Sequence, residues 1–406
     1  MTTEKLQTFT GQLEQWVAEG LLPGAHCLVT STDPASGKRL VSDTLVGYAD
    51  VEQQVALNEH SLFRLASASK LFVSAGCLTL IEAGELSLSD PVHSVLPEYE
   101  FLTCFDADGN AQAAKQVMTI EDLLRHSCGY GYGDEDSGDE GPGNEEPAYR
   151  KALMEAGLLG TDSHGDHWVH DYSLRQWAAK LATVPMESEP GCRVSYGLGH
   201  DILGAVIEVV TGQTLDHFLQ QRLFLPLGLN DTFFTVPEDR ISDLTNFYDF
   251  RDGQLELLET AKQSAFTRSP KAFSGGGGWD MLGNGGLVSS TADMTTLLQF
   301  ILNSGKQNET QLIEPALVNR LKMGASYSLE ISEMLPGCSY SFGIARVDDT
   351  ERYAGAGPLG KMFWGGSTNT YFYYLPEQKQ LGVFLTHTFP FAHLNAIYRF
   401  SGLSSD

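Results

Sequence analysis

Hydrophobic residues recur with two different spacings in the first part of the chain. Between residues 5 and 19 they fall every three or four positions, the period of an amphipathic helix, and Gly20 predicts its end. Residues 25–30 and 40–48 are predicted strands, joined by a turn at residues 33–37 that is rich in proline and glycine. A helix and a strand pair are therefore expected at the start of the chain.

The C-terminal part of the chain alternates between apolar and polar positions as strands do. Strands are predicted at residues 340–347, 362–366, 370–375 and 382–387, and a closing helix at residues 389–400.

Helix signals dominate the middle of the chain. Asp90-Pro91 is typical of a helix start with proline at the first helical position. Further helices are predicted over residues 119–125, 196–212, 214–224 and 290–305.

One of the predicted helices carries candidate chemistry at its start. The apolar run from Leu71 to Ile81 predicts a helix that begins near Ser67, which places Ser67 and Lys70 one turn apart on the same face. Serine is a strong nucleophile only when a base takes its proton, and lysine takes it when burial or nearby cations keep the amine neutral. Ser69 is a rival candidate, because Ser69-Lys70 fits the same helix start.

A tyrosine at a second helix entrance supplies a candidate base. The turn at Pro190-Gly191 leads to Tyr196, from which a helix is predicted to continue. A cation beside a phenol favours the phenolate, which then serves as a general base. Tyr196 therefore gains a chemical role if the fold brings it to Lys70.

Charge and cysteine content restrict the partners and the location. The chain has 406 residues and a formal net charge of -26, which repels nucleic acid phosphates and anionic membrane surfaces, so neither is an expected partner. Its six cysteines show no paired short spacing. The N-terminus lacks a signal pattern and no apolar run reaches membrane-spanning length, so a cytoplasmic location is expected.

Two polar clusters suggest metal binding at first sight. The acidic stretch at residues 133–147 does not fit the calcium-loop spacing and is interpreted as a solvated loop. His164, His167 and His170 lack the doubled ligand pattern of metallo-hydrolases, and no second ligand cluster follows. We interpret them as a polar lip of a cleft and expect no metal site.

The motifs together resemble a known superfamily. They are Phe63-Arg64-Leu65-Ala66-Ser67-Ala68-Ser69-Lys70, Leu123-Leu124-Arg125-His126-Ser127-Cys128-Gly129, Tyr196-Gly197-Leu198, Gly285-Gly286-Leu287 and Trp364-Gly365-Gly366. In this order they resemble the serine beta-lactamase/penicillin-binding-protein superfamily. Within it the chain is most similar to family VIII carboxylesterases, which are class C beta-lactamase-like, and to acyltransferases of the lovastatin pathway.

The resemblance implies an α+β fold of the beta-lactamase/transpeptidase type. An antiparallel sheet built from both chain ends would be flanked by the terminal helices and the Ser290 helix. Residues 1–84 and 270–406 would form this sheet domain, and residues 85–269 a largely helical inserted domain that carries the tyrosine motif.

The resemblance also assigns site residues. Ser67 matches the nucleophile, Lys70 its helix partner and Tyr196 the base, while the backbone N–H groups of Ser67 and Ser367 would form the oxyanion hole. Gly365 and Gly366 continue the third motif. No metal or organic cofactor is implied.

Two departures from the lactamase pattern indicate the subfamily. Leu198 stands where lactamases have asparagine, and Trp364 where they have the lysine that meets a substrate carboxylate. Lys361 is no replacement, because strand alternation places it on the face opposite Trp364.

These departures favour hydrolysis of small or short-chain neutral esters through an acyl-enzyme. The alternatives are a beta-lactamase, a D-alanyl-D-alanine peptidase-like enzyme, or an acyltransferase that uses an alcohol. A classical α/β-hydrolase is excluded, because the chain contains no G-x-S-x-G.

Overall fold

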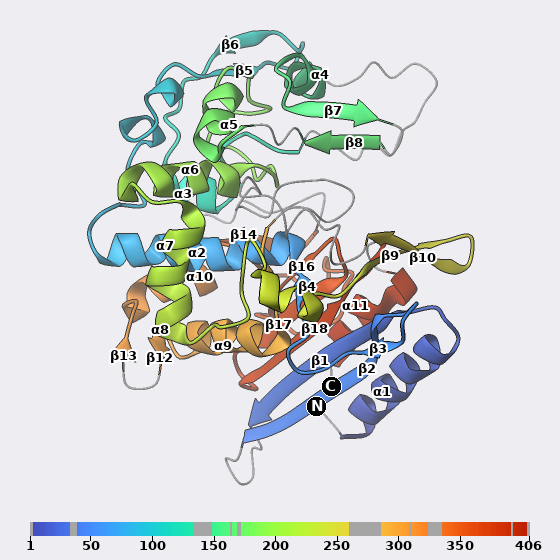
Figure 1. Ribbon diagram of the computed structural model, residues 1–406. Helices are drawn as coiled ribbons and strands as arrows, with labels where there is room; N and C mark the ends of the chain where they lie inside the picture. The colour runs from blue at the N-terminus through green and yellow to red at the C-terminus, as the bar shows by residue number, and fades with distance from the viewer. Residues whose placement is uncertain are drawn as a thin grey trace.

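An antiparallel sheet organises the computed structural model (Figure 1). The structure describes residues 3–32, 39–132, 148–162, 165–168, 172–259, 286–307, 310–323, 335–390 and 393–403. Within these residues the main sheet has eight strands in the order β14-β15-β16-β17-β18-β1-β2-β3. Their bounds are β1 Gly24–Thr32, β2 Arg39–Asp50, β3 Val55–Ala56, β14 Cys338–Ser341, β15 Ile344–Val347, β16 Met362–Gly366, β17 Thr370–Leu375 and β18 Gln380–Thr386.

The two ends of the chain meet in this sheet. β1 pairs antiparallel with β18, with Cys27 opposite Phe384. The terminal helices α1 (Thr3–Ala18) and α11 (Ala396–Gly402) pack on the sheet and on each other, where the Phe9 ring lies 6.1 Å from Phe384 and 5.7 Å from Phe400. Helix α9 (Thr291–Leu302) contacts β1 and β18. The predicted sheet from both chain ends, flanked by these helices, is confirmed.

Helices and short hairpins surround helix α2 (Ser69–Glu82), most of them above it in Figure 1. They are α3 Ile120–Leu124, α4 Ala148–Glu155, α5 Leu174–Leu181, α6 Gly199–Thr211, α7 Leu215–Leu219, the π-helical turn η4 Gln220–Phe224 and α8 Leu225–Leu227, with hairpins β5–β6 (Thr103–Phe105, Ala111–Ala113) and β7–β8 (Leu159–Asp162, Gly165–Trp168). The predicted start of α3 is confirmed by a reciprocal cap, because Thr119 and Asp122 each bond the other's backbone N–H. The division into two domains stays a prediction.

Smaller elements connect these parts. They are β4 Phe63–Arg64 paired with β11 Val288–Ser289, β9 Phe247–Arg251 and β10 Gln254–Glu259 joined to β19 Thr388–Phe389, the hairpin of β12 Lys306–Gln307 and β13 Thr310–Gln311, helix α10 Pro315–Met323, and the 3₁₀ turns η2 Val92–Ser94, η3 Pro97–Tyr99, η5 Glu238–Asp243 and η7 His393–Asn395.

Three predicted elements differ in the structure. Residues 340–347 are a hairpin rather than one strand, because Phe342 and Gly343 both have positive φ and turn the chain. A Cβ on Gly343 would lie 2.9 Å from the Leu71 Cα, so this tight turn also packs on α2. Pro91 is extended and precedes only a 3₁₀ turn, and the closing helix begins at Ala396.

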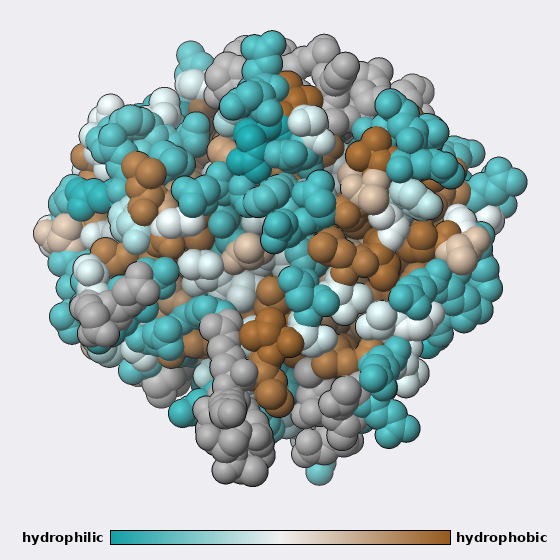
Figure 2. All heavy atoms as spheres, turned by 60° about the horizontal axis from the view of Figure 1, so that its bottom comes forward, coloured by the Kyte–Doolittle hydropathy of each residue, from teal (hydrophilic) through white to brown (hydrophobic). Residues whose placement is uncertain are grey.

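The surface shows no large hydrophobic face in the view of Figure 2, where hydrophilic and hydrophobic side chains are interspersed. Among the described residues, no single helix is both long and apolar enough to cross a membrane.

Candidate active site

Ser67 lies in a tight turn that leads into α2. The 3₁₀ turn η1 (Ala66–Ala68) precedes the helix, so the α-helix proper begins two residues later than predicted, at Ser69. Ser67 and Lys70 are nevertheless in contact, as predicted: Lys70 is fully buried and its Nζ donates a hydrogen bond to Ser67 Oγ at 3.3 Å. Ala66 holds a φ of 46°, an unfavourable conformation that the surrounding contacts must maintain.

Ser69 has a different, structural position. Its Oγ accepts a hydrogen bond from the Leu287 N–H at 2.8 Å, and the Leu287 carbonyl accepts from the Leu65 N–H at 2.8 Å. Ser69 is fully buried, whereas Ser67 lines the pocket. This geometry favours Ser67 over Ser69 as the nucleophile. Leu287 of the glycine-rich motif bonds Ser69 and Leu65 and so ties this motif to the start of α2.

Lys70 lies beside two tyrosines, Tyr132 and Tyr196. Its Nζ donates to the Tyr132 hydroxyl at 2.9 Å and lies 4.9 Å from the centroid of the Tyr196 ring. Tyr132 was not predicted from the sequence. No spacing pattern in the sequence marks it, because its position depends on Gly131, which bridges to Gly197, where a Cβ would lie 2.4 Å from the Gly131 carbonyl carbon.

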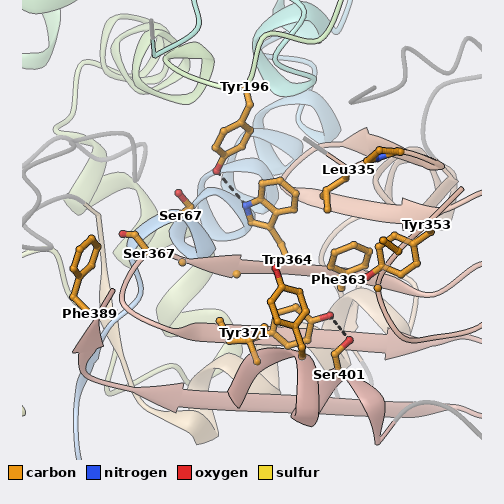
Figure 3. Close-up of a pocket in the computed structure, with 17 residues that line it drawn as sticks. Ser67, Tyr196, Leu335, Tyr353, Phe363, Trp364, Ser367, Tyr371, Phe389 and Ser401 are labelled. Carbon is orange, nitrogen blue, oxygen red and sulfur yellow. Dashed lines mark hydrogen bonds between the residues drawn. The ribbon is translucent and has the colours of Figure 1, made fainter. Parts of the chain in front are cut away.

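Tyr196 and Trp364 meet across the cleft (Figure 3). The Trp364 Nε1–H donates to the Tyr196 hydroxyl at 3.1 Å, and the ring centroids are 5.0 Å apart. Tyr340 packs against both rings. The tryptophan therefore offers a neutral donor to the tyrosine oxygen, at the position where lactamases have a lysine.

Two buried histidines support the tyrosine segment. His126 Nδ1 accepts from the Gly197 N–H at 3.2 Å, and the His200 Nε2 and Ser74 Oγ are hydrogen-bonded at 2.9 Å. Burial lowers the pKa of both imidazoles well below the usual value, and the Lys70 charge adds to this effect. Neutral imidazoles stand beside the lysine without repelling it.

Two threonines that follow the third motif bond the residues just before η1, the turn that carries Ser67. Thr368 Oγ1 donates to the Arg64 carbonyl at 2.6 Å, and Thr370 Oγ1 donates to the Leu65 carbonyl at 3.0 Å. These contacts bring Ser367, which follows β16, to the same pocket as Ser67. The Ser67 N–H is in the first turn of its helix, where N–H groups have no partner within the helix.

Gly366 is required by this close approach. A Cβ there would lie 2.1 Å from the Leu65 carbonyl oxygen, so we expect Gly366→Ala to move β16 away from η1. The expected cost is about 1 to 3 kcal/mol in stability, together with at least ~10-fold lower turnover. Thermal unfolding and kcat/KM on an aryl ester measure both effects. Gly11→Ala, in open space on α1, is the control and is expected to be neutral or stabilising. A Gly366→Ala variant with the stability and turnover of the wild type would show that this close approach does not require glycine.

The pocket has a volume of about 690 Å³. Its described lining is Ser67, Tyr196, Leu335, Pro336, Tyr353, Ala354, Gly355, Phe363, Trp364, Gly365, Gly366, Ser367, Tyr371, Phe389, Ile397, Tyr398 and Ser401. Nearly all the predicted site residues thus border one cavity, or, like Lys70, lie directly behind it. None of the described lining residues carries a charge.

Two residues discussed from the sequence, Leu198 and Lys361, are not among the described residues that line the pocket. Leu198 was predicted as a substrate-binding residue, but it is 1% exposed and belongs to the core. Lys361 donates to the Ala356 carbonyl and to Ser401 Oγ, whereas Tyr196 and Trp364 bond each other.

The predictions for the two polar clusters fall mostly outside the described residues. Residues 133–147, His164 and His170 lie outside the described part of the chain, and only the backbone of His167, in β8, is described. In the part that the structure describes, no group of three or more potential ligands is placed to hold a metal ion.

The comparisons with known proteins show the family of the chain. The beta-lactamase family matches residues 23–401. The chain is 30% identical to esterase EstB of Burkholderia gladioli over 329 residues, which cover 79% of this chain and 76% of EstB. It is 25% identical to a putative D-alanyl-D-alanine carboxypeptidase of Escherichia coli K12, covering 76% of this chain and 67% of that protein.

A solved structure extends the likeness to the whole fold. EstCE1, described as a hydrolase with promiscuous acyltransferase activity, has a TM-score of 0.78 at 23% identity and covers 99% of both chains. Fold and site thus define a serine beta-lactamase/penicillin-binding-protein-like protein. The chain belongs to the beta-lactamase family, and both esterases and peptidase-like proteins are among its relatives.

Proposed function

We propose that this protein is a serine hydrolase that cleaves neutral carboxylic esters through an acyl-enzyme. The observation that carries the proposal is the Lys70 Nζ at 3.3 Å from Ser67 Oγ, at one end of a pocket with no charged residue in its described lining. The esterase relatives EstB and EstCE1 support the same reaction class.

The reaction follows two acyl-transfer steps. Ser67 Oγ attacks the ester carbonyl carbon while its one proton passes to the base formed jointly by Lys70 and Tyr196, and the oxyanion is received by the Ser67 and Ser367 N–H groups. The intermediate then expels the alcohol, which takes a proton from the same groups, and leaves the acyl group on Ser67. Water, deprotonated by this base pair, releases the acid and restores the serine.

Trp364 favours esters over beta-lactams. Its ring is 4% exposed and offers an apolar wall and one N–H, which is engaged by Tyr196, so no cation meets a substrate carboxylate there. The net charge of -26 adds a long-range repulsion of anionic substrates that salt weakens. Transfer of the acyl group to an alcohol instead of water is a second outcome of the same acyl-enzyme, supported by the description of EstCE1.

We expect short-chain neutral aryl esters to be turned over at least ~100-fold better than a chromogenic cephalosporin, equivalent to about 2.7 kcal/mol in the transition state. The measurement is kcat/KM for both substrates at low and moderate salt. Equal values would place the peptidase-like or lactamase function first.

Two substitutions at Trp364 separate its contributions. Trp364→Lys is expected to lower ester turnover more than it raises cephalosporin turnover, because the apolar contact is lost. Trp364→Phe keeps a ring and removes the N–H, so the preference for esters is expected to remain. A lysine variant that gains lactam turnover without losing ester turnover would show that ring contact is unimportant.

A further inference from the structure

The pocket extends beyond the catalytic residues into a ring-lined space that we call the distal chamber, formed by Tyr353, Phe363, Tyr371, Tyr398 and Ser401 (Figure 3). Strands β16 and β17 contribute Phe363 and Tyr371, and helix α11 contributes Tyr398 and Ser401. The whole pocket, at about 690 Å³, exceeds what a small acyl group needs, and the flat aromatic walls of the distal chamber fit a ring.

A fully buried lysine fixes the far end of this chamber. Lys361 Nζ donates to the Ala356 carbonyl and to Ser401 Oγ, each at 2.5 Å, and lies 5.9 Å from the centroid of the Tyr371 ring. A Cβ on Gly357 would lie 2.3 Å from the lysine Cδ, so the 354–357 loop packs directly on it. One side chain thus joins β16, this loop and α11, and holds the wall hydroxyls in place.

The hydrogen bonds at the far end leave one acceptor position on the hydroxyl oxygen of Tyr371, a residue that lines the pocket. Ser401 Oγ donates its proton to the Ala356 carbonyl at 3.2 Å, so in its 3.1 Å contact with Tyr371 the tyrosine is the donor. The phenol oxygen of Tyr371 has then used its proton and keeps a lone pair. A bound group with a hydroxyl or N–H donor matches that lone pair, whereas an ether or a carbonyl does not.

We propose that the distal chamber binds the larger half of the ester, a ring that carries a hydroxyl or N–H donor, through the Tyr371 hydroxyl. The inference rests on the proposed ester hydrolysis, with which it shares the pocket. Tyr371 is then a specificity-determining residue: the ring stacks among aromatic side chains, and the donor on the ring meets the phenol oxygen.

Two series of esters test this proposal and distinguish the halves of the substrate. The acyl series is methyl cinnamate with hydrogen, hydroxyl or methoxyl at the ring 4-position, and the alcohol series is 2-phenylethyl acetate with the same substituents. In at least one series, kcat/KM for the hydroxyl ester is expected to exceed that for the methoxyl ester by about threefold to tenfold, the range of a single neutral hydrogen bond.

Variants on β17 supply the matched control. Tyr371→Phe should remove the preference for the hydroxyl ester. Tyr373→Phe should keep it, because Tyr373 lies on the same strand outside the pocket, with its hydroxyl bonded to Gln380. Equal treatment of the three substituents by the wild-type enzyme in both series, or equal behaviour of the two variants, would overturn the proposal.

A binding measurement separates this inference from the proposed function. Calorimetry with the Ser67→Ala variant reports the affinity for the same intact esters without turnover, and the hydroxyl ester is again expected to bind more tightly. If 4-nitrophenyl acetate is hydrolysed while ring substituents have no effect on rate or affinity, the chamber proposal fails and ester hydrolysis stands. If no ester is hydrolysed, the proposed function fails, and the affinities alone decide the role of Tyr371.

Discussion

Replacing Ser67 with alanine is expected to abolish ester turnover, a loss of ~10⁴-fold or more in kcat, as found when a catalytic nucleophile is removed. Ser69→Ala is the matched control from the same helix start. It removes the acceptor of the Leu287 N–H, so we expect a stability loss of about 1 to 3 kcal/mol with most of the turnover retained. Kinetics on an aryl ester and thermal unfolding measure the two effects.

A phosphonate probe distinguishes the two serines directly. Labelling of Ser67, located by peptide mass spectrometry, is the expected result, since this serine lines the pocket and Ser69 is fully buried. Label on Ser69, or a Ser69→Ala enzyme that is as inactive as Ser67→Ala while folded, would mean that the other serine is the nucleophile.

Tyr196→Phe is expected to lower kcat by about a hundredfold to ten-thousandfold, the usual cost of losing a general base. The phenylalanine ring keeps the contacts with Trp364 and His126, so the fold should survive while proton transfer fails. Steady-state kinetics together with the unfolding temperature separates these outcomes.

Tyr340→Phe is the control for that experiment. Tyr340 belongs to the same aromatic cluster, 5.8 Å from Tyr196 between ring centroids, yet it is not among the described residues that line the pocket. Removing its hydroxyl is expected to change kcat by less than about threefold, because rates respond to groups that act in proton transfer. Similar losses in both variants would indicate a packing role for Tyr196.

The periodic parts of the fold were predictable from the sequence because local pattern decides them. Strands β16 and β17 begin and end where the alternation places them, and α6 ends at Gly212 in the left-handed conformation that glycine favours. The hairpin at Phe342-Gly343 was not predictable in this way. Its turn is imposed by packing on α2, a contact between segments far apart in the sequence.

The same distinction applies to the site. Ser67, Lys70 and Tyr196 stand in motifs whose spacing carries chemical meaning, and the structure brings them together. Tyr132 and the distal chamber carry no such spacing: their positions depend on a bridge between two glycines and on a lysine buried under α11. Long-range contacts of this kind follow from the fold and have no local signature.

The threonine contacts that hold the turn η1 have a consequence for the order of events during synthesis. Thr370 bonds the Leu65 carbonyl across 305 residues of chain. At typical rates of elongation, a ribosome needs about 15 to 60 s to make that length. Contacts of such long range also close slowly. Ser67 therefore leaves the ribosome long before the residues that orient it, and the nascent chain stays catalytically silent until the C-terminal strands have been made and have folded back onto the N-terminal part.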